Sequence, residues 1–229
     1  MFPIRDRLPT HRFPFVTVLF IAINIVVFAW QMLILGGGGE DALQQAVYTW
    51  GVVPARIAED PGPLTLVTFV TSMFMHGGFM HIIGNMLYLW IFGNNIEDVL
   101  GRFWFIVFYF ACGFAASAAQ VFATWGSNIP GIGASGAIAG VLAAYLLFYP
   151  AARVDTLIFL GLFARIAALP AVLVLGMWFV LQLFNGVLSF GMTETGGTAW
   201  FAHIGGFVAG LILCLPWISK ARRRRSYRW

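Results

Sequence analysis

The chain has 229 residues, of which 60% are hydrophobic and only 10% are charged. A soluble domain carries roughly a quarter charged residues and just under half apolar residues, so this composition excludes a soluble globular domain. It also argues against a disordered chain, a collagen, a disulfide scaffold and a nucleic-acid-binding domain, although the formal net charge is +4. We therefore expect a polytopic membrane protein.

Six apolar segments approach the roughly 20 residues that a helix needs to cross a bilayer. The first covers residues 13–35, and a long connection with Gly, Pro and acidic residues follows it at 36–71. The other spans are expected at residues 79–94, 103–124, 135–149, 170–188 and 199–218. Residues 151–169 contain two arginines and an aspartate, and we expect this segment to lie at the membrane surface.

The basic residues agree with six spans, which place both chain ends on one side of the membrane. Nine of the 13 Lys and Arg residues lie before the first span or after the last, and Arg102, Arg153 and Arg165 fall in loops on the same side. Twelve thus share one side, and only Arg56 lies on the other. Cytoplasmic loops carry such an excess of Lys and Arg. We therefore predict an all-α fold, a bundle of six transmembrane helices. Its predicted parts are a cytoplasmic segment at 1–12, a membrane domain at 13–218 and a basic cytoplasmic tail at 219–229.

Polar side chains inside the predicted spans gather at one depth. The second, fourth and sixth spans run from the outside to the inside, so their first residues lie near the outer face. His81 and Asn85 are four residues apart and share one face of the second span. Ser135 opens the fourth span, and His203 lies early in the sixth. Polar residues are costly in lipid and mark functional sites, so we expect these four side chains to meet.

Two stripes of small residues indicate how the fourth and sixth helices approach each other. The stripes have a spacing of four and consist of Gly136, Gly140 and Ala144 in the fourth span and Ala202, Gly206 and Gly210 in the sixth. Small residues let helix backbones pack closely in lipid, and taken alone such stripes indicate only packing. Close packing here would bring the Ser135 hydroxyl within the ~2.6–3.2 Å of the His203 imidazole that proton transfer requires.

The residues around Ser135 suit an anionic intermediate. Gly133 and Gly136 permit a tight turn and leave room for a substrate backbone. A serine at a helix N-terminus lies beside unpaired N–H groups and the positive end of the helix dipole. An oxyanion would be stabilised by these donors together with the side chains of His81 and Asn85.

Four motifs resemble those of the rhomboid family of intramembrane serine proteases. They are His76-x4-His81-x3-Asn85, Glu97-x3-Gly101-Arg102, Gly133-Ala-Ser135-Gly136 and Ala202-His203-x2-Gly206-x3-Gly210. Each motif is weak alone, whereas the four together, in the family's order and spacing over nearly the whole chain, are highly specific.

The resemblance implies an endopeptidase that hydrolyses peptide bonds in or near transmembrane segments through a Ser–His dyad. Ser135 would be the nucleophile and His203 the general base. His81, Asn85 and the backbone N–H of Ser135 would form the oxyanion hole. The positions that support this site would be His76, Gly133 and Gly136.

The resemblance also implies how the surroundings of the site are built. Residues 36–71 would form a flap embedded in the membrane, residues 190–198 would form a mobile cap, and Glu97 and Arg102 would tie helix ends together. Two features depart from the family: the Trp-Arg pair that some members have in the first loop is absent, and the aromatic residue that often packs on the base, four positions after the serine, is missing. Here that position is Ala139, so His203 is either oriented by another residue or held less firmly.

The expected partners are transmembrane-helix protein substrates and the lipid bilayer. Substrate helices must unwind locally to expose a peptide bond, so we expect them to carry small or helix-breaking residues near the outer face. No cofactor is expected, and the His-Glu-x2-His motif of a metalloprotease does not occur. We expect a monomer or weak oligomer in a prokaryotic inner membrane, with both termini cytoplasmic and the active site toward the outer face.

Two other functions remain open from the sequence. A catalytically silent rhomboid-like protein that binds transmembrane helices would be expected to lack Ser135 or His203, and this chain has both. A proton-coupled transporter would use the same polar residues but should show repeats with broken helices in paired positions.

Overall fold

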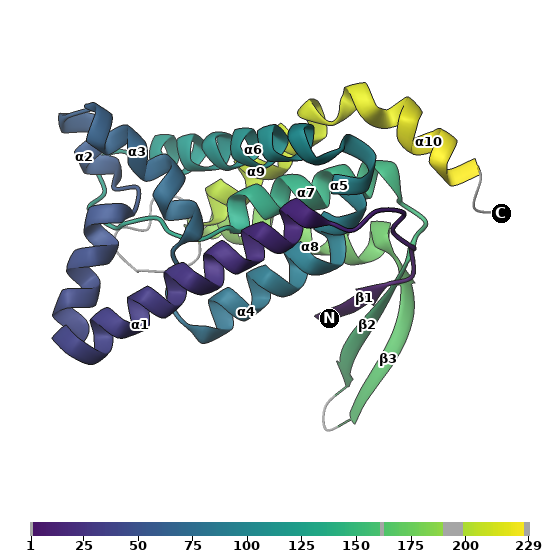
Figure 1. The fold of residues 1–229 in the computed structure, drawn as a ribbon, viewed down its shortest axis with the longest axis horizontal. Coiled ribbons are helices and arrows are strands. Elements are labelled where there is room, and N and C mark those ends of the chain that lie inside the picture. The colour runs from purple at the N-terminus through teal and green to yellow at the C-terminus, as the bar shows by residue number, and fades with distance from the viewer. Residues whose placement is uncertain (1, 161–162, 190–198, 227–229) are drawn as a thin grey trace.

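Helices dominate the computed structural model, which describes residues 2–160, 163–189 and 199–226 (Figure 1). In chain order the helices are α1 (Phe15–Trp50), α2 (Pro54–Glu59), α3 (Pro63–Thr71), α4 (Phe79–Tyr88), α5 (Asn94–Leu100), α6 (Arg102–Ala123), α7 (Ser135–Phe148), α8 (Ala171–Ser189), α9 (Trp200–Leu213) and α10 (Ile218–Ser226). A π-helical turn at Leu89–Gly93 joins α4 to α5, and 3₁₀ turns lie at Ser72–Phe74 and Leu215–Trp217. The strands are β1 (Phe2–Asp6), β2 (Arg153–Leu160) and β3 (Phe163–Pro170).

The described residues give three to five candidate membrane spans. Helices α1, α6 and α8 are each long and apolar enough to cross a membrane. Two bent pairs qualify only when both halves are counted together: Pro63–Phe74 with Phe79–Leu100, bent by 81°, and Trp200–Leu213 with Leu215–Arg223, bent by 43°. The 14 residues of α7 fall short of the roughly 20 that a full span needs. The predicted number of six spans is therefore not confirmed.

Helix α1 extends beyond the predicted end of the first span. The glycine run at 36–39 predicted a loop there, but Gly39 is the residue in α1 with non-helical backbone angles, φ 74° and ψ −170°. Without a Cβ it adopts this conformation readily. Good helix formers such as Ala42 and Leu43 then continue the helix in a second arm. In Figure 1 this arm turns sharply and covers one end of the bundle. Much of the predicted connection at 36–71 is thus helical.

The expectation of a purely helical fold misses a three-stranded antiparallel sheet in the order β1-β2-β3. Strands β2 and β3 form a hairpin with continuous pairing from Arg153↔Pro170 to Leu160↔Phe163. The charges in residues 151–169 suggested a surface segment, but the segment is also rich in β-branched and aromatic residues, which favour strands. The sheet and α10 gather at one end of the helices, opposite α2 and α3 (Figure 1).

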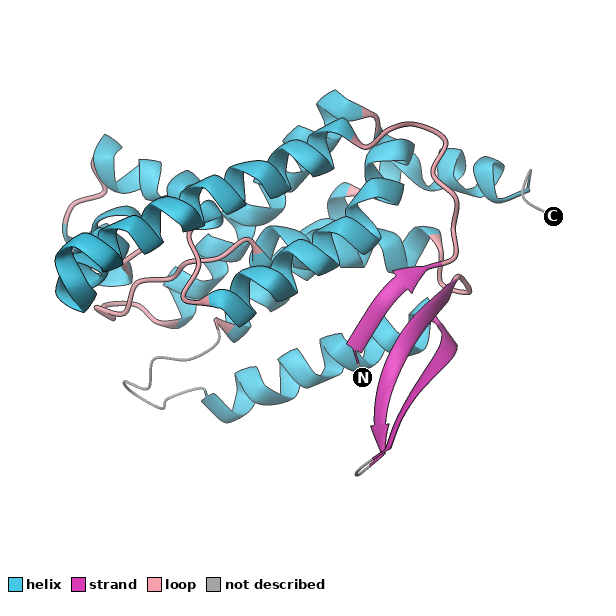
Figure 2. Ribbon diagram, turned by 60° about the horizontal axis from the view of Figure 1, so that its bottom comes forward, coloured by secondary structure: helices cyan, strands magenta, loops and turns pink. Residues whose placement is uncertain are grey.

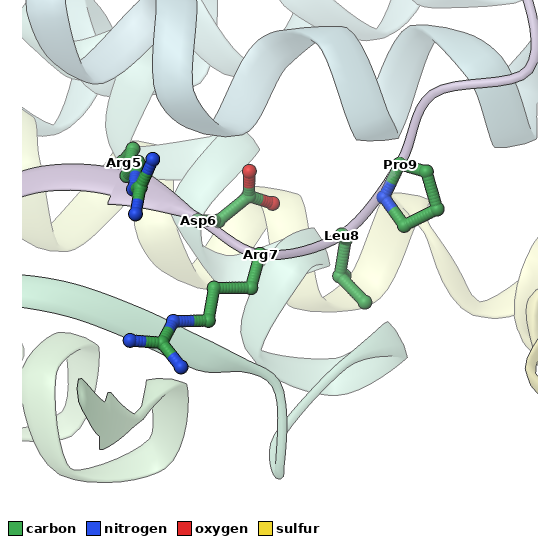
Figure 3. A pocket seen from close by; sticks show the side chains of 5 residues that line it. All are labelled: Arg5, Asp6, Arg7, Leu8 and Pro9. Atoms are coloured by element: carbon green, nitrogen blue, oxygen red, sulfur yellow. The ribbon is translucent and has the colours of Figure 1, made fainter.

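The N-terminal segment is joined to this sheet through charged side chains. Asp155 on β2 accepts hydrogen bonds from Arg7 Nε at 2.8 Å and Arg5 Nε at 2.7 Å. These bonds hold the pKa of the Asp155 carboxyl below its usual value. The Asp6 side chain points away from that of Arg7 (Figure 3), and its Oδ2 accepts a hydrogen bond from Tyr145 of α7 at 2.7 Å. The segment thus contacts both the sheet and the helical core.

Helices α6, α7 and α9 form the centre of the bundle, and the predicted small-residue stripes lie between them. A Cβ atom at Gly206 would collide with the carbonyl oxygen of Gly136, and one at Gly210 would collide with the carbonyl oxygen of Gly140. The prediction that small residues bring α7 and α9 together is therefore confirmed. Helix α8 lies at the edge of the bundle, and its first residues adjoin the sheet (Figure 2).

Candidate active site

Ser135 is the first residue of α7, as the sequence predicts. Gly133, two positions before it, has a backbone φ of 126°, a value that residues with a Cβ rarely adopt. A Cβ at Gly133 would also lie 2.8 Å from His81 Nε2 and 3.6 Å from Ser135 Oγ. Glycine at this position thus lets the chain turn and lets the imidazole of His81 approach the serine. On the other side, a Cβ at Gly136 would collide with Ala116.

The predicted contact between Ser135 and His203 is present. Nε2 of His203, on α9, lies 2.8 Å from Ser135 Oγ. His203 is buried and Ser135 is half-buried. A hydroxyl at this distance from an imidazole nitrogen has the geometry of a nucleophile with its base.

The other ring nitrogen of His203 has a partner that sequence reasoning missed. Nδ1 lies 2.7 Å from Oε1 of Gln182, a buried residue of α8. One turn earlier on α8, the ring of Trp178 lies 5.7 Å from the imidazole, with an angle of 39° between the planes. The signal in the sequence was a polar residue within an apolar span.

His81 and Asn85 lie on α4 and line the same cavity as Ser135 and His203. The backbone N–H of Gly77 donates to His81 Nδ1 at 3.3 Å. A neutral imidazole that accepts at Nδ1 carries its hydrogen on Nε2, and His81 Nε2 is the atom that faces Gly133. The cavity has a volume of about 1530 Å³ and is also lined by apolar side chains, among them Met73, Met80, Trp178 and Trp200.

His76 lies behind this cavity wall and contacts both neighbouring polar residues. Nδ2 of Asn85 donates to His76 Nε2 at 2.9 Å, and the rings of His76 and His81 are 5.0 Å apart. Gln31 of α1 holds the His76 backbone: its Oε1 accepts from the N–H and its Nε2 donates to the carbonyl, each at 3.0 Å. Gln31 was also missed, although it is a polar residue within an apolar span.

Glu97 does not line this cavity and caps a helix instead. Its carboxylate accepts hydrogen bonds from the backbone N–H groups of Val16 and Thr17, at 2.9 and 2.8 Å, and from the Thr17 hydroxyl at 2.8 Å. These N–H groups lie in the first turn of α1 and have no partner within the helix.

Within the part of the chain that the structure describes, no group of three His, Cys, Asp or Glu residues is arranged to hold a metal. The predicted cap at 190–198 lies outside the described residues.

Comparison with known proteins identifies both bacterial and mitochondrial relatives. The chain is 33% identical over 134 residues to the rhomboid protease GluP of Bacillus subtilis, which covers 58% of this chain and 24% of GluP. It is 31% identical over 149 residues to the human mitochondrial presenilin-associated rhomboid-like protein, covering 62% of this chain and 35% of that one. It is 32% identical over 100 residues to the mitochondrial rhomboid protein 1 of Saccharomyces cerevisiae, covering 41% and 28%. The matches thus span about a quarter to a third of these relatives.

A family model described as the rhomboid domain matches residues 63–220. This region is more than half of the chain, and it contains Ser135, His203, His81 and Asn85. The chain therefore belongs to the rhomboid family.

Proposed function

We propose that the chain is an intramembrane serine endopeptidase that hydrolyses peptide bonds in or near transmembrane segments of membrane proteins. The observation that carries this proposal is the 2.8 Å contact between Ser135 Oγ and His203 Nε2 at the wall of a large cavity. The family includes the GluP protease, and this relationship supports the same class of activity here.

In the proposed mechanism, His203 Nε2 takes the hydroxyl proton as Ser135 Oγ attacks the carbonyl carbon of the scissile peptide bond. The tetrahedral intermediate then expels the amine, which receives the proton from His203, and an acyl-enzyme remains on Ser135. A water molecule, deprotonated by His203, attacks this ester and releases the carboxyl product. The proton returns to Ser135 Oγ, so the enzyme is restored.

The oxyanion of each intermediate would bind the backbone N–H of Ser135 and the side chains of His81 and Asn85. The hydrogen that we assign to His81 Nε2 makes this nitrogen a donor on the side of Gly133. Nδ2 of Asn85 has two hydrogens, of which one is donated to His76 and the other is left for substrate. His76, Gly133 and Gly136 would support the site without taking part in the chemistry.

We place this chemistry in a protein that passes the membrane six times, with α7 as a short span. The excess of Lys and Arg at the two chain ends favours a cytoplasmic location for both. The relatives are mitochondrial as well as bacterial, and we propose a prokaryotic inner membrane, with a monomer or weak oligomer as the active form. Substrates would carry small or helix-breaking residues, because a peptide bond within a regular helix is not accessible.

The test compares wild type, Ser135→Ala and Ser117→Ala in liposomes with a transmembrane model substrate. Ser117 on α6 lines the same cavity, so its variant is a matched control that removes a hydroxyl without touching the dyad. We expect wild type and Ser117→Ala to cleave and Ser135→Ala to be inactive. Equal cleavage by wild type and Ser135→Ala would overturn the assignment. Substrate binding without cleavage by any of the three would favour the catalytically silent alternative.

A further inference from the structure

The amide of Gln182 is buried in α8 beside the proposed general base, and its two ends have different partners. Oε1 lies 2.7 Å from His203 Nδ1, and Nε2 donates to the backbone carbonyl of Trp178 at 3.4 Å. Turning the amide over would set its oxygen against that carbonyl oxygen, and two acceptors cannot form a hydrogen bond. The contact with Trp178 therefore keeps the acceptor end of Gln182 on the imidazole.

This arrangement determines which ring nitrogen of His203 carries the hydrogen. Because Oε1 of Gln182 only accepts, the neutral imidazole donates from Nδ1, and the lone pair of Nε2 is left for the hydroxyl of Ser135. In the opposite tautomer Nε2 would carry the hydrogen and would be unable to take a proton from Ser135. We propose that Gln182 is a positioning residue that holds His203 in the tautomer and orientation needed for general-base catalysis. This proposal rests on the proposed function.

In the Ser-His-Asp triad, a carboxylate holds the histidine in the required tautomer and orientation. Across the described ranges, neither Asp nor Glu forms a hydrogen bond or ion pair with His203, whereas the amide of Gln182 is in place. A buried carboxylate is costly in apolar surroundings unless it is paired, and an amide offers the same acceptor without the charge. A neutral third residue thus suits a base that lies among apolar helices.

Helix α8 provides both the hydrogen-bond partner of His203 Nδ1, Gln182, and an aromatic ring beside the imidazole, that of Trp178. Trp178 and Gln182 are four residues apart and so share one face of the helix. The aromatic side chain that Ala139 on α7 does not provide is thus replaced by one on α8. The neighbouring residues Val180 and Leu181 are 57% and 49% exposed, so α8 has an outward face as well as this inward one. The orientation of His203 therefore depends on the docking of α8.

The test uses Gln182→Met, which keeps the length of the side chain but removes the acceptor. Gln182→Glu restores an acceptor, and Leu181→Met is the matched control on the outward face of α8. Residues that orient metal-ligating histidines through a hydrogen bond typically contribute 10–100-fold to activity, and we use the same range for the orientation of His203. We expect Gln182→Met to lower kcat and the rate at which a fluorophosphonate labels Ser135 by about 10- to 100-fold, with KM little changed. Gln182→Glu should recover most of this loss, and Leu181→Met should match wild type.

Nitrogen NMR of the histidine rings gives a readout that does not require activity. The chain has four histidines, and the His203 signals are assigned by their loss in His203→Asn. Wild type should show the hydrogen on Nδ1 of His203, and Gln182→Met should show a mixture of both tautomers. If Gln182→Met unfolds, Gln182→Asn, whose shorter side chain withdraws the acceptor, replaces it in both measurements.

The outcomes separate this proposal from the proposed function. If wild type neither cleaves nor is labelled, but Gln182→Met changes the His203 tautomer, the proteolytic function fails and the positioning of His203 stands. If wild type cleaves and folded Gln182→Met matches it in labelling rate, kcat and NMR signature, the positioning role is overturned and the proteolytic function stands. A loss in Gln182→Met that Gln182→Glu does not relieve, with an unchanged tautomer, also overturns the positioning role.

Discussion

Ser135 and His203 lie 68 positions apart in the sequence, yet Ser135 Oγ and His203 Nε2 are separated by only 2.8 Å. Their helices, α7 and α9, meet where Gly206 packs against the carbonyl oxygen of Gly136. The distance between nucleophile and base is therefore set by a backbone contact between the residue that follows Ser135 and a residue one turn after His203. This relationship makes the glycine contact a direct target for testing the site.

We expect Gly206→Val to separate α7 from α9, because a side chain at this position collides with the backbone of Gly136. Overpacking of this kind costs about 1–3 kcal/mol, and the shift should reduce labelling of Ser135 by a fluorophosphonate more than tenfold. The control is Gly176→Val on α8, where an added Cβ meets no described atom within 4 Å. Equal labelling of Gly206→Val and wild type would show that this contact does not set the dyad distance.

Asn85→Ala should lower kcat about 100-fold, which is the loss that removal of one oxyanion donor typically causes. KM should change little, since the amide interacts with charge that develops only during the reaction. Asn128→Ala is a matched control, because Asn128 lines the same cavity without a place in the proposed mechanism. The kinetics of both variants on the model substrate in liposomes measure the difference. A rise in KM at unchanged kcat would instead assign Asn85 to ground-state binding.

The sheet at one end of the bundle should loosen at acid pH. The hydrogen bonds from Arg7 and Arg5 lower the pKa of Asp155, so its contribution to stability is complete above the ordinary carboxyl value of about 4. That contribution is lost as the pH falls through the lowered pKa of the folded protein. We expect the protection of the amides in residues 2–6 against hydrogen exchange, relative to the intrinsic exchange rate at each pH, to fall below about pH 4.

In Asp155→Asn the same amides should be less protected at neutral pH, and this acid-dependent loss of protection should be absent. Asp60→Asn, at the other end of the helices, should exchange like wild type in residues 2–6. If Asp155→Asn retained the full acid response, another titrating group would be responsible for it.

The apolar segments predicted the later helices closely, because length and hydrophobicity suffice to locate a span. The fourth and fifth were expected at residues 135–149 and 170–188, and the structure has α7 at Ser135–Phe148 and α8 at Ala171–Ser189. The extension of α1 and the sheet were missed, since a glycine run and scattered charges outweighed local helix and strand preferences. The glycine run does bend α1 and the charged residues are present, but neither feature determined the secondary structure of its segment.

The dyad was predictable because its motifs and small-residue stripes lie in the sequence itself. The contacts of Gln31 and Gln182 could not be predicted from the sequence. An almost uniformly apolar helix has no pattern that shows which face points inward. Their positions in a span marked them as exceptional, but only the packing of α1 and α8 assigns their partners. Polar residues that support a membrane site thus require the tertiary structure.

The final prediction concerns Gln31, whose two hydrogen bonds hold the backbone of His76. Gln31→Leu leaves a buried N–H and a buried carbonyl without their partner, and each unsatisfied group costs about 1–3 kcal/mol. The thermal unfolding midpoint in detergent should fall. The kcat should fall too, because His76 holds the oxyanion donor Asn85 through a 2.9 Å hydrogen bond. Gln44→Leu, a change of the same kind on the exposed second arm of α1, should affect neither quantity. A lower midpoint with unchanged kcat would limit Gln31 to stabilising the fold, whereas a loss of both would connect α1 to the oxyanion hole through His76.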